Sequence, residues 1–201
     1  MKLLHVGVIG IFLMISYSVL AINTFIDEKT GHMLAIKPAT EEDLKWAQEF
    51  CIEFFTPIYK NITLDYDQLT HGSYEAFAEN NFNNHHRNIF ILNKYKFFVV
   101  EDCNNKKNIG YTIISIDKDK IYSIETQALI ENYSIQSLMS GLSNFINNEI
   151  EPKASCFISA VRKKMQPFID VLKTCDFLEA DSSWLHSSMS PEYYQALIRK
   201  L

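Results

Sequence analysis

The segment from residue 121 to residue 161 constrains the fold more than any other part of this 201-residue sequence. It begins with an apolar, strand-like run, Ile121 to Leu129, and ends with a second one, Cys156 to Val161. Between them, apolar residues recur at the i, i+3, i+4, i+7 spacing of an amphipathic helix, which Pro152 ends. A strand, a helix and a strand in this order predict a parallel, right-handed unit within a sheet.

The residues before this unit predict an antiparallel meander. Residues 96–102, 108–117 and 121–129 are apolar runs separated by short polar turns, the pattern of strands joined by hairpins. Further upstream, residues 33–38 form a predicted strand. Thr40 follows it and is placed to cap a helix whose first turn is acidic.

The residues after 161 predict further alternation of helix and strand. We expect a helix around residues 165–172, a last strand from Trp184 to Met189 and a C-terminal helix that starts at Pro191. The whole order predicts an α/β fold of the mixed, α+β kind, with a mostly antiparallel central sheet flanked by helices. A chain of this length has room for one such domain, which we place at residues 33–201.

Charge and cysteine content narrow the class of protein. Lys and Arg number 19 against 24 Asp and Glu, which gives a net charge of −5. A mildly acidic chain lacks the basic surface of a general nucleic-acid binder. Four cysteines without a CxxC pair argue against a disulfide scaffold and against a cysteine zinc site. In an exported protein, Cys156 and Cys175 remain candidates for a disulfide.

Residues 1–21 predict an export segment. Lys2 precedes an almost unbroken apolar run, and the small side chain of Ala21 suits a cleavage site. The run is also near the minimum length of a membrane-spanning helix, so a cleaved signal peptide and an uncleaved anchor both remain open. We therefore expect an exported or membrane-anchored protein with a linker at residues 22–32. Translation from Met33 would instead give a cytoplasmic protein.

Four short strings lie in the order and spacing found in a known family. They are the strand and helix cap at residues 36–44, the hairpin at 98–111, the strand end and turn at 128–133, and residues 161–164 followed by Asp176-Phe177. Together they resemble the GNAT acetyltransferase superfamily over residues 34–189. The resemblance implies the GNAT acyl-CoA N-acyltransferase fold. It also implies transfer of an acetyl group from acetyl-CoA to an amine, on a small molecule or on a protein.

The resemblance further implies that the helix after Tyr133 binds the diphosphate of acetyl-CoA, because a helix N-terminus presents free N–H groups and a positive dipole end. The residues so implied to bind the cosubstrate are Leu129, Ser134, Ile135, Gln136, Ser137, Leu138 and Met139. Here the sequence departs from the family pattern. Ser134 replaces an Arg or Gln, and Ser137 and Met139 replace glycines. A register shifted by two residues recovers Gln136 and Gly141 but misaligns the apolar face of the helix.

Glu125 is the candidate general base. It lies in the strand where the family often carries a glutamate, and an amine must lose a proton before it can attack a thioester. The alternative is a solvent-facing glutamate without a catalytic role. Leu172 replaces a tyrosine that often protonates the leaving thiolate, and Met165 replaces an asparagine that contacts CoA. Tyr111 and Tyr122 are candidate proton donors only because they lie in the same predicted meander as Glu125.

Two functions therefore stay open. The first is an N-acetyltransferase that uses acetyl-CoA, with Glu125 as its base. The second is a non-catalytic GNAT-fold module that binds a partner or ligand after its CoA site eroded. Exported bacterial compartments hold no ready acetyl-CoA supply, so an exported enzyme conflicts with the first function unless translation starts at Met33 or the cosubstrate comes from elsewhere.

Other side-chain groups carry weaker signals. His71, His85 and His86 have no carboxylate at helical spacing to complete a ligand set, so we expect no metal site. Cys103 sits in a predicted turn without the glycine-flanked elbow of a nucleophile. The sequence leaves the acceptor open, and also whether the chain forms a homodimer through a sheet edge.

Overall fold

The computed structural model describes residues 24–62, 72–83, 95–117, 119–149, 155–187 and 189–200. Within these ranges the strands are β1 (Thr24–Ile26), β2 (Met33–Pro38), β3 (Tyr95–Asp102), β4 (Lys107–Ile116), β5 (Ile121–Leu129), β6 (Cys156–Arg162), β7 (Leu178–Ala180) and β8 (Tyr194–Lys200). The α-helices are α2 (Glu41–Ile62), α3 (Tyr74–Asn81), α4 (Ile135–Glu149) and α5 (Gln166–Thr174), and a 3-10 turn covers Ser182–Trp184.

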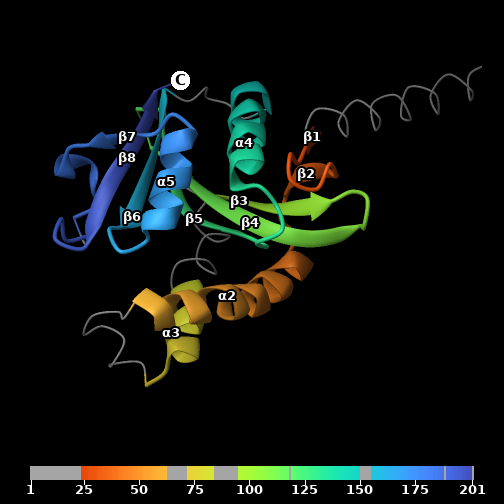
Figure 1. Cartoon of the computed structure of the whole chain (residues 1–201), viewed down its shortest axis with the longest axis horizontal. Coiled ribbons are helices and arrows are strands. Elements are labelled where there is room, and N and C mark those ends of the chain that lie inside the picture. Colours follow the sequence, from red (N-terminus) through yellow and green to blue (C-terminus); the bar gives the residue numbers. More distant parts are fainter. Residues whose placement is uncertain are drawn as a thin grey trace, which may run out of the picture.

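The described strands form one eight-stranded sheet in the order β1-β2-β3-β4-β5-β6-β8-β7. β3, β4 and β5 make the predicted antiparallel meander. β5 and β6 are parallel neighbours joined through α4, as the sequence of residues 121–161 predicts. The other neighbours are antiparallel. The predicted mixed, mostly antiparallel sheet is therefore confirmed (Figure 1).

Helices cover both faces of this sheet. Figure 1 shows α4 and α5 above it and α2 and α3 below it. The core under α4 and α5 includes Leu138, Leu142 and Ile169, and the core under α2 includes Ala47 and Cys51. Successive strand residues point to opposite faces, so each central strand supplies side chains to both cores.

The start of α2 is fixed by a reciprocal pair of hydrogen bonds. The Thr40 hydroxyl accepts from the Asp43 N–H at 3.3 Å, and the Asp43 carboxylate accepts from the Thr40 N–H at 2.9 Å. The predicted cap at Thr40 is thus confirmed. Asn108 of β4 donates to the same carboxylate at 2.8 Å, which ties the helix start to the sheet. Burial raises the pKa of Asp43, but these hydrogen bonds and nearby Lys37 outweigh it, so the pKa lies below its ordinary value.

The C-terminal elements differ from the prediction. The strand expected at residues 184–189 and the helix expected from Pro191 are wrong, because the chain forms the 3-10 turn and then β8. β8 inserts between β6 and β7 and is antiparallel to both. Its residues Ala196 and Leu197 are buried. The local preference of these residues for helix was overridden by sheet pairing, because a strand at this place satisfies backbone groups of β6 and β7 that a helix could not reach.

The segment expected to be a linker also differs. From Thr24 onward it is folded: β1 pairs with β2 in antiparallel fashion, and Gly31 turns the chain with a φ of 71°. We call residues 24–32 the N-terminal hairpin segment. The predicted export segment at 1–21 and the histidines His71, His85 and His86 lie outside the described residues.

The described residues also answer two questions, on disulfides and on membrane-spanning helices. The cysteines Cys51, Cys103, Cys156 and Cys175 are all free, so the disulfide considered between Cys156 and Cys175 is not formed. None of the helices in the described ranges combines the length and the apolar character needed to cross a bilayer.

Candidate functional site

The central feature of the site is the separation of β5 from β6. Their parallel register runs from Ile121 opposite Cys156 to Ile124 opposite Ser159 and then stops. Both strands continue past that point, β5 to Leu129 and β6 to Arg162. The register therefore ends in mid-strand, and the backbone of the second half of β5 is left without a strand partner on the β6 side.

Glu125 lies at the point where this separation begins. The β4–β5 register shifts between Ile113 and Ile114, so Glu125 is an extra residue without a Cα partner on β4, that is, a β-bulge. Its side chain is exposed and accepts a hydrogen bond from the Ser115 hydroxyl. Glu125 therefore stands at the apex of the separation, on a bulge that re-aims its side chain. Its catalytic role stays a prediction.

A cleft of about 950 Å³ lies beside the separated strands. Aromatic side chains of α2, among them Trp46, Phe50 and Phe54, line it. The end of β5, the β5–α4 connection and the first turn of α4 line it as well. Trp46 and Phe50 are stacked, with ring centroids 5.0 Å apart. The lining of the cleft thus combines aromatic side chains with the polar end of a helix.

Two buried polar side chains face each other across β4 and β5. Thr112 and Gln127 are register partners, and Thr112 is fully buried. The Thr112 hydroxyl and both polar atoms of the Gln127 amide are buried without a hydrogen-bond partner among the described residues. Buried polar atoms are nearly always paired in folded proteins. Gln127 lies two residues before Leu129, which lines the cleft, so the unpaired amide is on the same side of the strand.

Ser134 caps the N-terminus of α4. Its hydroxyl accepts from the Ser137 N–H at 3.1 Å, and its carbonyl accepts from the Leu138 N–H at 3.1 Å. No described residue accepts a hydrogen bond from the N–H groups of Ile135 and Gln136, which line the cleft. The first turn of α4 therefore presents two backbone donors and the positive end of the helix dipole to the cleft.

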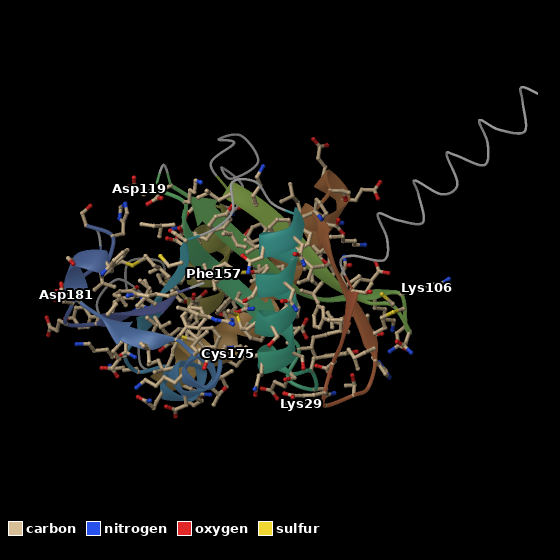
Figure 2. The ribbon with its side chains drawn as sticks, turned by 90° about the horizontal axis from the view of Figure 1, so that it is seen from above. Lys29, Lys106, Asp119, Phe157, Cys175 and Asp181 are labelled. Carbon is tan, nitrogen blue, oxygen red and sulfur yellow. The ribbon has the colours of Figure 1, made fainter. Side chains whose placement is uncertain are left out.

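The N-terminal hairpin segment places two carboxylates on this helix end. Asp27, which is fully buried, accepts from the Ser134 N–H at 2.7 Å. Glu28 accepts from the Ser134 hydroxyl at 2.6 Å, and its own N–H donates to the Ser137 hydroxyl at 3.1 Å. The Nζ of Lys29 lies 3.2 Å from the Tyr133 carbonyl oxygen, and Figure 2 shows Lys29 beside the end of α4.

Asp102 holds the surrounding loops together. Its buried carboxylate accepts from the Tyr133 hydroxyl at 2.7 Å and from the Asn105 side chain at 2.7 Å, and it lies 2.8 Å from His32 Nδ1. Burial raises the pKa of the Asp102 carboxyl, but hydrogen bonds from Tyr133, His32 and Asn105 outweigh it and hold the pKa well below its usual range. Burial and the bond to Asp102 raise the pKa of Tyr133 to about 12. Sequence reasoning missed Asp102, because its partners His32 and Tyr133 are 70 and 31 residues away in the chain.

The residues that the resemblance implies for cosubstrate binding fall into two groups, those that line the cleft and those that do not. Leu129, Ser134, Ile135 and Gln136 line the cleft. Ser137 instead contacts the N-terminal hairpin segment through Glu28. Leu138 and Met139 are buried in the core, with 0% and 1% of their surface exposed. Leu138 and Met139 therefore pack the inner face of α4 and do not line the cleft, and their predicted role in cosubstrate binding stays a prediction.

The structure also locates the other candidate residues and the other residues that depart from the family pattern. Leu172, which stands where the family has a tyrosine, is fully buried in the core, as are Tyr111 and Tyr122, so none of the three presents a group to the cleft. Met165 is the residue before α5. Asp176, which stands at a family glycine, has a left-handed backbone with φ 65°. Among the described residues no cluster of three His, Cys, Asp or Glu side chains is placed to hold a metal ion.

Comparisons with known proteins identify the fold. No family model matches the sequence, and no curated protein matches it. Among solved structures, the chain is similar to the spermidine N-acetyltransferase of Vibrio cholerae in complex with CoA and spermine, at 13% identity and a TM-score of 0.54, with 83% of this chain and 95% of that chain covered. It is also similar to an acetyltransferase of the GNAT family from Staphylococcus aureus Mu50, at 14% identity and a TM-score of 0.56, with 83% and 98% covered.

A third similar structure is an N-acetyltransferase of Campylobacter jejuni, at 12% identity and a TM-score of 0.50, with 83% of this chain and 97% of that chain covered. These likenesses extend over nearly the full length of the solved chains. They show that this chain has the GNAT acyl-CoA N-acyltransferase fold, which confirms the fold that the sequence resemblance implied.

Proposed function

We propose that the protein is a GNAT-like N-acyltransferase that transfers an acetyl group from acetyl-CoA to an amine. The observation that carries this proposal is the separation of β5 from β6 beside an open cleft, in a chain with this fold. Unpaired strand backbone next to a cleft offers hydrogen-bonding groups to an extended ligand. The buried amide of Gln127 adds side-chain donors and an acceptor on the same strand.

The charge of the cleft favours an amine as acceptor. Glu28, Glu53 and Glu131 line it, whereas its lysine, Lys29, is engaged with backbone carbonyl groups. Amines are largely cationic near neutral pH, so carboxylates raise their local concentration. The stacked rings of Trp46 and its neighbours can hold a cation by cation–π attraction. The Vibrio cholerae neighbour was solved with spermine, which is an amine of this kind.

Glu125 is the residue that we propose to accept a proton from the acceptor amine. It stands at the apex of the strand separation, next to the cleft but not among its lining residues, so we propose that a water carries the proton to it. Ser115 orients its carboxylate through a hydrogen bond. Acetyl transfer forms a C–N bond and breaks the C–S bond of a thioester. The ammonium form of the acceptor first loses a proton, the attacking nitrogen then loses a second one, and the departing thiolate takes up a proton to leave as the free thiol. The carboxylate of Glu125 supplies a site for the proton that the ammonium loses.

The residues present suit part of acetyl-CoA and not all of it. The separated strand and Gln127 suit the amide-containing pantetheine arm, which can pair with backbone and amide groups. The α4 N-terminus does not suit the diphosphate in the described arrangement, because Asp27 and Glu28 already place negative charge there. We therefore assign no step of the reaction to the diphosphate end.

A non-catalytic GNAT-fold binding module is the second candidate function. The same two carboxylates favour it, together with Leu172, which leaves the family's tyrosine position without an acid. In such a module the aromatic and acidic cleft would hold a cationic ligand without reaction. A homodimer stays a proposal for either function; one Vibrio cholerae neighbour is described as dodecameric.

Turnover distinguishes the two functions. The full chain is incubated with acetyl-CoA and a series of primary amines that ends with spermidine and spermine, and both free thiol and acetylated amine are quantified. Acetylated amine in proportion to thiol, lost in Glu125→Gln, supports the enzyme. Amine binding without any acetylated product supports the binding module.

A further inference from the structure

We infer that Asp27 and Glu28 set donor specificity: they occupy the anion-binding end of α4, so that the cleft binds a thioester donor through its neutral pantetheine arm and excludes the diphosphate. This inference rests on the proposed function, because it concerns which part of the donor is recognised. The residues responsible lie in the N-terminal hairpin segment, outside the region where the sequence resembles the family.

Through these contacts, the hairpin segment places the carboxylates of Asp27 and Glu28 at the N-terminus of α4, where a bound anion would lie. Asp27 accepts from the Ser134 N–H, and Glu28 accepts from the Ser134 hydroxyl. A phosphate bound at a helix N-terminus uses the same kind of donor and the same dipole. The carboxylates therefore already supply what the diphosphate would supply, and they reduce the positive potential that would attract it.

The N–H groups of Ile135 and Gln136 remain unused, but a diphosphate that reached them would lie against the Glu28 carboxylate. Like charges in contact at a binding site are strongly unfavourable. Lys29 does not offset this repulsion, because its Nζ is 3.4 Å from the Glu131 carbonyl and 3.2 Å from the Tyr133 carbonyl. The arrangement thus disfavours an anion even though two backbone donors are free.

The hairpin segment is anchored, so its carboxylates are a fixed part of the site. Asp27 has no exposed surface, and its second oxygen accepts from the Thr30 N–H at 2.9 Å and the Thr30 hydroxyl at 2.8 Å. Phe25 packs directly on α4 at Gly141, where an added Cβ would lie 2.5 Å from the Phe25 ring. A glycine at position 141 therefore lets Phe25 of the hairpin segment pack directly against the surface of α4.

Calorimetric titration of the full chain with inorganic diphosphate, CoA and pantetheine tests the inference. For the wild type we expect no detectable diphosphate binding, and CoA and pantetheine dissociation constants within about threefold of each other. Glu28→Gln keeps an oxygen for the Ser134 hydroxyl but removes the charge. It should permit diphosphate binding and tighten CoA binding roughly tenfold, with pantetheine unchanged. The gain should shrink as salt is raised.

Two further variants sharpen the test. Glu49→Gln makes the same charge change on an exposed α2 residue outside the cleft and should leave all three affinities unchanged. Gly141→Ala pushes on Phe25 without changing any charge, and should also permit diphosphate binding by loosening the hairpin segment. It keeps the test decisive if Glu28→Gln does not fold.

The outcomes separate this inference from the proposed function. Wild-type CoA binding more than about 30-fold tighter than pantetheine binding would overturn the inference, even if acetyl transfer is observed. Diphosphate binding that is equal in the wild type and in the folded variants would also overturn it. Diphosphate binding that appears only in Glu28→Gln and Gly141→Ala supports it, even if no amine is acetylated and the proposed enzyme function fails.

Discussion

The hydroxyl of Tyr133 donates a 2.7 Å hydrogen bond to the carboxylate of Asp102, and this bond joins the β5–α4 connection to the end of β3. His32 meets the same carboxylate from the hairpin segment. One buried acid therefore fixes the positions of the cleft wall and of the segment that covers the α4 N-terminus. Hydrogen bonds to a charged group contribute about 1.5–3 kcal/mol, so Tyr133→Phe should lower the unfolding free energy by a similar amount.

Acid should destabilise the protein partly through Asp102. Because its pKa in the folded protein is below that of a free aspartate, the stability it contributes is present above about pH 4 and is lost as the pH falls through the folded-state pKa. Urea unfolding between about pH 2 and pH 7 should show a decline at the acid end that flattens in Asp102→Asn. An equally steep decline in the variant would show that other groups cause it.

Glu125→Gln should lower turnover by roughly 100-fold or more, the usual scale for a general base. Donor affinity should change little, because Glu125 does not line the described cleft. Ser115→Ala, which removes the hydrogen bond to Glu125, should have a smaller effect and shift the pH dependence of turnover. An unchanged rate in Glu125→Gln would assign the base to another residue.

Gln127→Met should change stability and binding in opposite directions. The buried amide has no partner among the described residues, so a side chain of similar volume without polar atoms should raise the unfolding free energy by about 1 kcal/mol. Loss of the same amide should weaken binding of pantetheine. Chemical denaturation and calorimetry measure the two effects, and a destabilised variant would contradict the account of an unpaired amide.

Asp176→Gly should stabilise the protein by roughly 1 kcal/mol. Asp176 holds a left-handed conformation just after α5, and the next N–H, that of Phe177, donates back to the Leu172 carbonyl at 3.1 Å. Glycine adopts this conformation without the steric cost that other residues meet. Asp176→Ala is the matched control, because it keeps that cost and should bring no gain. The midpoint of urea unfolding compares the three proteins.

A chain that starts at Met33 should be less stable than one that starts at Ile22. The shorter chain lacks β1, the Asp27 bond to Ser134 and the packing of Phe25 at Gly141. We expect a difference of about 2–5 kcal/mol, from loss of a partly buried aromatic side chain and a charged hydrogen bond. Equal unfolding free energies would show that the hairpin segment is not part of the folding unit. Intact mass of the native protein then shows which start the cell uses.

The sequence predicted the central architecture because the strongest patterns lie there. The three strands at 96–129, the α4 helix and the parallel unit that follows combine clear periodicity with short turns, so local pattern and tertiary structure agree. β8 was mistaken for a helix because its residues favour helix locally, whereas its strand conformation is set by insertion between β6 and β7.

The site was predictable only in part, for a related reason. The β5 end and the α4 start follow from local order, and Leu129, Ser134, Ile135 and Gln136 line the cleft; their role in cosubstrate binding stays a prediction. The contacts of Asp27 with Ser134 and of Asp102 with His32 span 107 and 70 residues. No periodicity or motif connects such residues, and the short strand β1 is too brief to produce a pattern of its own.

The two ends of the sheet have a consequence for association between chains. Both outermost strands, β1 and β7, are only three residues long. A short border strand offers few free backbone groups for a second molecule to pair with, and proteins use such strands to prevent edge-to-edge aggregation. A homodimer built by extending the sheet across either border would gain little hydrogen bonding. Self-association of this chain should therefore use helix surfaces rather than the borders of the sheet.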